Sequence, residues 1–132
     1  MRAAIFVILV VLSMALALSA QSHHSFSAEF DIARPVSLTG TVSRIEWTNP
    51  HAWIYIDVDD GSGSTQSWGI ELLGINTLMR RGLTRTSIAP GDVLTIEGFG
   101  ARNGTNSANA STVKATDSGD VLWASAAGDR RD

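Results

Sequence analysis

A strict alternation of side chains follows the turn signal Asn49-Pro50, and this alternation constrains the fold more than any other stretch. Between residues 51 and 58, aliphatic side chains occupy every second position, and polar or aromatic side chains occupy the positions between them. This is the period of a strand that buries one face in a core. The other face carries His51, Trp53 and Tyr55, so the segment predicts both a strand and a candidate site.

The same period recurs along the chain. A pattern that runs from Val36 to Val42 changes phase before Ile45 and Trp47, which indicates a bulge or sharp bend beside Gly40. After the central strand, the patterns predict four more strands and one short helix. The strands are expected at residues 66–72, 93–99, 107–115 and 121–123, and the helix between a capping Asn76 and Gly82.

The order of these elements predicts a mainly β fold with a single domain. Three strands, a short helix and further strands, with a bent first strand, form a small OB-like Greek-key barrel of five to six strands, whose helix lies between strands three and four. An open sandwich of similar size is the alternative. We place the barrel at residues 36–125, an N-terminal arm at 21–35 and a disordered tail at 126–132.

The beginning of the chain has the features of a secretory signal peptide. Arg2 is followed by residues 3–20, which carry no charge and end in small side chains. This pattern predicts a signal peptide at residues 1–20 that is cleaved after Ala20, with Ala17 as the less favoured cleavage point, and therefore a periplasmic or secreted protein. An uncleaved membrane anchor is the alternative, because the apolar stretch approaches the length that spans a bilayer. Contact with a membrane is expected only through that segment.

The net charge and the cysteine content limit the classes of partner and site that the chain can have. Removal of residues 1–20 takes away Arg2 alone and leaves nine Lys and Arg against thirteen Asp and Glu, a net charge of −4. Proteins that bind phosphate backbones depend on Lys and Arg, so we expect no nucleic acid partner. The chain has no cysteine, which excludes disulfides, thiolate metal sites and a cysteine nucleophile. No recognised catalytic motif is present either, so we expect a non-enzymatic binding protein.

The three histidines form the candidate metal site, and they fall at two points of the chain. Cleavage after Ala20 would place His23 third in the mature chain, where an amine, two amides and an imidazole can surround Cu(II) or Ni(II) in a square plane. His24 and His51 are further nitrogen donors. A disordered start and a turn-stabilising His51 are the plainer interpretations. Oxygen ligands or supporting carboxylates would come from Glu29, Asp31, Glu46 or Glu71.

The aromatic strand face supports a second interpretation, a carbohydrate or small-ligand module. Trp53 and Tyr55, with Glu71 on the next strand, would lie on the surface that OB barrels use for oligosaccharides. The candidate ligand-binding residues are Trp47, Asn49, Trp53, Tyr55 and Glu71. Alternatively, these rings pack against Phe26 and Phe30 of the arm, or meet a protein partner in a structural or assembly role.

Four stretches resemble a family of small exported bacterial proteins that is classed as a domain of unknown function. They are His-His-Ser-Phe-Ser-Ala-Glu-Phe-Asp at 23–31, Leu-Thr-Gly-Thr-Val at 38–42, Glu-Trp-Thr-Asn-Pro-His-Ala-Trp at 46–53 and Pro-Gly-Asp-Val at 90–93. The resemblance implies an OB-like fold and export, and it assigns no activity. It also marks His23, His24 and His51, which match the double histidine and the Asn-Pro-His histidine of the family. Family members carry the double histidine next to the cleavage point, whereas Gln21-Ser22 intervenes here.

Overall fold

The computed structural model describes residues 26–126 and residue 129. The predicted signal peptide at 1–20 and the histidines His23 and His24 lie outside the described residues. Six strands and two short helices follow one another, and the fold is mainly β. The elements are α2 (Phe26–Glu29), β1 (Phe30–Glu46), β2 (Trp53–Asp59), β3 (Thr65–Glu71), α3 (Ile75–Arg80), β4 (Val93–Ala101), β5 (Ser107–Ala115) and β6 (Val121–Ala124).

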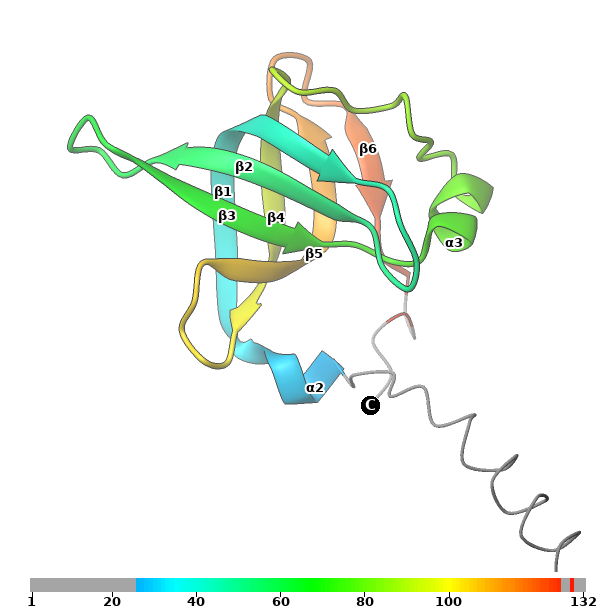
Figure 1. Cartoon of the computed structure of the whole chain (residues 1–132), viewed down its shortest axis with the longest axis horizontal. Coiled ribbons are helices and arrows are strands. Elements are labelled where there is room, and N and C mark those ends of the chain that lie inside the picture. The colour runs from blue at the N-terminus through cyan, green and yellow to red at the C-terminus, as the bar shows by residue number, and fades with distance from the viewer. Residues whose placement is uncertain (1–25, 127–128, 130–132) are drawn as a thin grey trace, which may run out of the picture.

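The strands form one sheet whose hydrogen bonding returns to its starting point. The sheet order is β3-β2-β1-β4-β5-β6, and β3 also pairs with β5. All neighbours in that order are antiparallel, whereas β3 and β5 are parallel and bring Ile70 beside Ala108. Five strands therefore enclose a common interior, and β6 adds an outer edge. Figure 1 shows β1 rising beside β4 and then turning over to lie against β2.

The predicted bend in β1 is present. The register with β2 shifts between Val42 and Arg44, so one strand pairs with β4 before the bulge and continues with β2 beyond it. Gly40 lies just before this shift. A Cβ atom at Gly40 would lie 2.7 Å from the carbonyl oxygen of Asp57, so only glycine lets the two backbones approach this closely.

β1 starts earlier than the alternation indicated. The sequence predicted an arm up to residue 35, but the strand begins at Phe30, which pairs with Ala101. Pro35 looked like a terminator because proline cannot donate a ladder hydrogen bond. It is accommodated because the β1–β4 register is irregular between Phe30 and Pro35. In addition, the amide of Arg102 donates to the Glu29 carbonyl at 2.8 Å and ties the arm to β4.

The inward positions of the strands form the core. Ile54 and Ile56 alternate inward from β2 as predicted, and Leu78 of α3 is fully buried against the same cluster. Burying such an aliphatic side chain contributes roughly 1.5–3 kcal/mol, so this interior is the main source of stability in a chain without cysteine. The helix cap differs from the prediction. Gly74 takes the N-cap position rather than Asn76, and no side chain caps the helix.

Asp129, which follows β6 in the chain, contacts Arg81 at the end of α3. Within the predicted tail, Ala126 and Asp129 belong to the described residues. The Arg81 guanidinium donates to Asp129 at 2.8 Å, so at least this part of the tail is held by an ion pair at the end of α3. Among the residues described, no helix is both long and apolar enough to cross a membrane.

Candidate functional site

A row of polar side chains crosses the ends of three strands. Trp53 of β2 is the register partner of Glu71 on β3, and Glu71 is in turn the parallel partner of Asn109 on β5. His51 precedes β2 at the same end. Glu71 Oε1 lies 3.0 Å from His51 Nδ1 and accepts a hydrogen bond from Asn109 Nδ2 at 3.3 Å. The row therefore holds an imidazole, a carboxylate and an amide in one connected group.

Glu71 is the unusual member of this group because it is a buried acid. Its exposed fraction is only 6%. Burial, together with the negative charge of Glu29, raises the pKa of the Glu71 carboxyl to about 7, although the Asn109 hydrogen bond opposes this shift. A carboxyl with such a pKa can hold or release a proton near neutral pH.

The contact with Glu71 fixes the orientation of the His51 ring. Nδ1 faces the carboxylate, and a carboxylate in that position holds an imidazole in one orientation. The His51 side chain is 34% exposed, which allows an ion to approach from solvent. Of the four carboxylates that the sequence offered as ligands or supports, Glu71 is one that contacts His51.

The described residues do not by themselves complete a metal site. Over residues 26–126 and 129, no group of three or more His, Cys, Asp or Glu side chains lies close enough together to hold a metal ion. His51 is the described member of the predicted triad, and His23 and His24 lie outside the described residues. The expected convergence of the three imidazoles therefore stays a prediction.

The aromatic face has a different arrangement. The Trp53 and Tyr55 rings lie 6.4 Å apart at an angle of 23°, and both approach the backbone of Gly69 on β3. The Arg44 guanidinium stacks on the Tyr55 ring, 3.9 Å from its centroid, and also bonds to Glu46. The Tyr55 hydroxyl completes this cluster with a 3.2 Å hydrogen bond to Glu46. One face of Tyr55 is therefore covered by a side chain of the protein itself.

The phenylalanines of the arm gather elsewhere. Phe26 lies 5.7 Å from Phe30 and 6.0 Å from Phe99, measured between ring centroids. These contacts attach α2 to β1 and β4. One interpretation of the sequence packed the arm's rings against the aromatic strand face, whereas Phe26 packs on Phe30 and on Phe99 of β4.

The remaining candidates, Trp47 and Asn49, lie in the connection between β1 and β2. Trp47 is partly buried and packs against the hydrophobic core. Asn49 precedes a cis peptide bond to Pro50 and lies beside Gly74, where an added Cβ would be 2.9 Å from the Pro50 carbonyl oxygen. Trp47 therefore has a packing role at the base of the loop that carries His51, whereas Asn49 is exposed.

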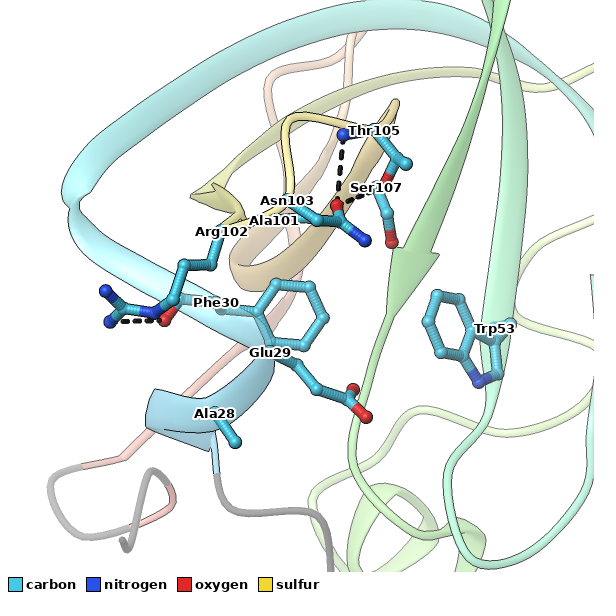
Figure 2. Close-up of a pocket in the computed structure, with 9 residues that line it drawn as sticks. All are labelled: Ala28, Glu29, Phe30, Trp53, Ala101, Arg102, Asn103, Thr105 and Ser107. Carbon is cyan, nitrogen blue, oxygen red and sulfur yellow. Dashed lines mark hydrogen bonds between the residues drawn. The ribbon is translucent and has the colours of Figure 1, made fainter.

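A pocket of about 400 Å³ opens beside Trp53. Glu29 and Phe30 form one side, Trp53 forms another, and the connection from β4 to β5 provides Arg102, Asn103 and Ser107. Figure 2 shows the Phe30 and Trp53 rings on either side of the opening, with the Glu29 carboxylate directed into the gap between them. Asn109 and this pocket were not found from the sequence. An asparagine among small residues in β5 was the one local signal for a buried amide.

Comparison with known proteins identifies the family and adds little else. The chain belongs to the Family of unknown function (DUF6152), whose model matches residues 10–110. Among curated proteins, none matches the sequence.

Similar solved structures include two of the mitochondrial single-stranded DNA binding protein Rim1 from S. cerevisiae. They are 14% and 19% identical, with TM-scores of 0.46 and 0.47, and the matches cover 69% and 70% of this chain and 95% and 97% of theirs. A ZRD-deleted mutant of TiaS in complex with agmatine is 16% identical, with a TM-score of 0.46, over 64% of this chain and 22% of that one. These similarities are too weak to bear on function.

Proposed function

We propose that this member of the DUF6152 family is an exported, non-enzymatic protein that binds a divalent transition metal ion, copper foremost, through His23, His24 and His51. The observation that carries the proposal is the 3.0 Å contact between Glu71 Oε1 and His51 Nδ1. Histidines that bind metals usually have their second ring nitrogen held by a carboxylate, a backbone carbonyl or a water molecule, which fixes the ring and raises its basicity. A buried acid placed in this way is the kind of support such a ligand requires.

The position of α2 supports the participation of the double histidine. Glu29 of α2 lies close enough to Glu71 for its charge to raise the pKa of that carboxyl, so α2 lies near the carboxylate that holds His51. His24 precedes Phe26 by two residues, and two residues of chain span at most about 7 Å. The double histidine is therefore held close to the start of α2, and the proposal requires it to reach His51 from there.

The donor types favour copper. Imidazole and amine nitrogens suit Cu(II), which binds nitrogen sites more tightly than the other divalent first-row ions. A mature chain that begins at Gln21 would add a terminal amine and two amides to the His23 ring. In this proposal the leader at 1–20 directs the protein to the periplasm or the exterior.

The fold proposed for this function is an OB-type barrel. The closed order β1-β2-β3-β5-β4, with α3 between β3 and β4, supports it. In such a barrel, His51 would lie at one mouth, where the arm enters.

Isothermal titration of Cu(II) into the mature protein at neutral pH tests the metal proposal, and intact mass defines the first residue. We expect saturable binding, a roughly 10- to 100-fold weaker affinity for His51→Ala, and no specific binding when all three histidines are alanine. Thr48→Ala, an exposed change in the same loop, is the matched control and should bind as the wild type does. Equal, weak binding by the wild type and the triple variant would refute the proposal.

A further inference from the structure

We propose that the pocket beside Trp53 is a second binding site, for a neutral pyranose sugar. Three separate segments build the pocket: the end of α2, the start of β2 and the connection between β4 and β5. Its volume of about 400 Å³ falls within the range of small-molecule sites, about 300–1,000 Å³. Binding there requires no metal ion, so the site goes beyond the function proposed above.

Trp53 supplies the aromatic wall of the site. A Cβ atom at Gly69 would lie 3.6 Å from two atoms of the indole ring, so the glycine leaves room for the ring to lie over β3. The neighbouring Tyr55 ring is covered by the Arg44 guanidinium at 3.9 Å and lies outside the pocket lining. Figure 2 shows the Trp53 ring across the opening from Phe30. The C–H face of a pyranose ring is apolar and can pack on an aromatic wall of this kind.

The connection between β4 and β5 supplies fixed polar groups on another side. Asn103 Oδ1 accepts hydrogen bonds from the Thr105 amide at 3.1 Å and from its hydroxyl at 2.8 Å, so the Asn103 side chain is held in one orientation. Both Asn103 and Ser107 line the pocket, and among the described residues neither Asn103 Nδ2 nor the Ser107 hydroxyl has a hydrogen-bond partner. An amide donor and a hydroxyl that donates or accepts match the hydroxyl groups around a sugar ring.

The charged side chains around the pocket do not require a charged ligand. Figure 2 shows Arg102 extending away from the opening. Its guanidinium donates to the carbonyl oxygens of Ser27 at 3.1 Å and Phe30 at 3.4 Å and lies 3.7 Å from the Asp31 carboxylate, so its charge serves the attachment of the arm. Glu29 borders the same opening and takes part in an interaction of its own, so no ligand contact is assigned to it.

The combination of walls selects a sugar over simpler ligands. A purely apolar ligand would remove the amide and the hydroxyl of the β4–β5 side from water without giving them partners. A small open-chain polyol would satisfy those groups and leave the indole ring without an apolar partner. A pyranose meets both walls at once, because its C–H face and its hydroxyl groups lie on one rigid ring.

Nuclear magnetic resonance of ¹⁵N-labelled mature protein in excess chelator tests the site. The probes are methyl β-glucopyranoside, cyclohexanol as a ring with a single hydroxyl, and erythritol as hydroxyls without a ring. We expect the glucoside to shift the Trp53 indole signal saturably, and each of the other two probes to bind at least about threefold more weakly. Cellobiose, which adds a second ring, should bind more tightly than the glucoside if the natural ligand is the end of a glycan chain, and equally if it is a free sugar.

Asn103→Asp tests the polar wall without disturbing the turn. The aspartate keeps the oxygen that accepts from Thr105 and replaces the amide donor by a second oxygen. Glucoside binding should weaken about three- to tenfold. Asn76→Asp, the same change at an exposed position of α3, is the matched control and should leave binding unchanged.

Three results would overturn the proposal. Equal binding of cyclohexanol would show an apolar pocket without recognition of hydroxyl groups, and unchanged glucoside binding by Asn103→Asp would remove the polar wall from the site. The absence of any saturable shift would show no site. Because metal is removed throughout, failure of the copper proposal would not change these outcomes, and failure here would leave the copper titration intact.

Discussion

Two glutamates flank Trp53 in the sheet, and their surroundings differ sharply. Trp53 pairs with Glu46 on β1 and with Glu71 on β3, so one row of the sheet carries both acids. Glu46 is partly exposed and is bonded to the Arg44 guanidinium and the Tyr55 hydroxyl. Glu71 is buried and contacts the titratable His51 and the neutral Asn109.

The difference separates an acid that is paired with a permanent cation from an acid that is buried beside an imidazole. An exposed carboxylate beside a permanent cation is satisfied and contributes little to stability. A buried carboxylate beside an imidazole has no permanent cation in those contacts, and its protonation depends on pH and on what binds nearby. The Glu71 side of Trp53 is therefore where metal or ligand chemistry is expected, and the Glu46 side holds the rings in place.

The largest effect expected from this difference is on how the free energy of unfolding depends on pH. Glu71 has a pKa of about 7 in the folded chain against 4.5 ordinarily, so the folded state binds its proton more tightly. Its contribution is fully present below pH 4.5 and is lost as the pH rises through about 7, a change on the order of 3 kcal/mol. Urea unfolding of chelated protein at several pH values should show this loss in the wild type, relative to a flatter curve for Glu71→Gln. Parallel curves would contradict it.

The second largest effect is expected on metal affinity, which should depend on Glu71 and not on Glu46. Glu71→Ala leaves His51 without its orienting carboxylate, so Cu(II) affinity should fall roughly 10- to 100-fold. Glu46→Ala, on the other side of Trp53, should change it by less than about twofold, since its partners are Arg44 and Tyr55. Competitive titration against a chelator of known affinity measures both. Equal losses in the two variants would remove the distinction.

Two glycine substitutions test the strand beside Glu71 and the strand beside Tyr55 separately. A Cβ at Gly98 would lie 2.2 Å from the Asn109 carbonyl oxygen, so Gly98→Ala must displace the strand that presents Asn109 to Glu71. We expect a loss of about 1–3 kcal/mol in the free energy of unfolding. At Gly69, the added Cβ would meet the Tyr55 ring at an ordinary 3.5 Å, and Gly69→Ala should change stability by less than about 1 kcal/mol. Chemical denaturation of both variants measures the difference, and the reverse order would be inconsistent with this geometry.

The smallest effect is expected at Arg44. Arg44→Ala removes a partly exposed ion pair and the cation stacked on Tyr55, and should lower the free energy of unfolding by at most about 1 kcal/mol. It should also uncover the Tyr55 ring and increase quenching of tyrosine fluorescence by acrylamide. A loss of several kcal/mol would mean that this cluster supports the fold and not only the surface.

Most of the fold could be predicted from local sequence patterns. The alternation in β2, the bulge after Val42 and the helix before β4 follow from backbone geometry that repeats every two or 3.6 residues, so a single sequence shows them. The start of β1 was missed because Pro35 suggests an end when its neighbours are unknown. Pairing of Phe30 with Ala101 across the sheet outweighs that local preference.

What the sequence determined by itself was the set of strands, their inward faces and the types of donor that the chain can offer. Only the tertiary structure decided that Glu71 is buried against His51 and Asn109, and that Arg44 covers Tyr55. It also decided that Glu29 faces a pocket beside Trp53. The reason is physical: strand period is a property of neighbouring backbone units, whereas burial, proton affinity and charge complementarity depend on distances through space between residues far apart in the chain.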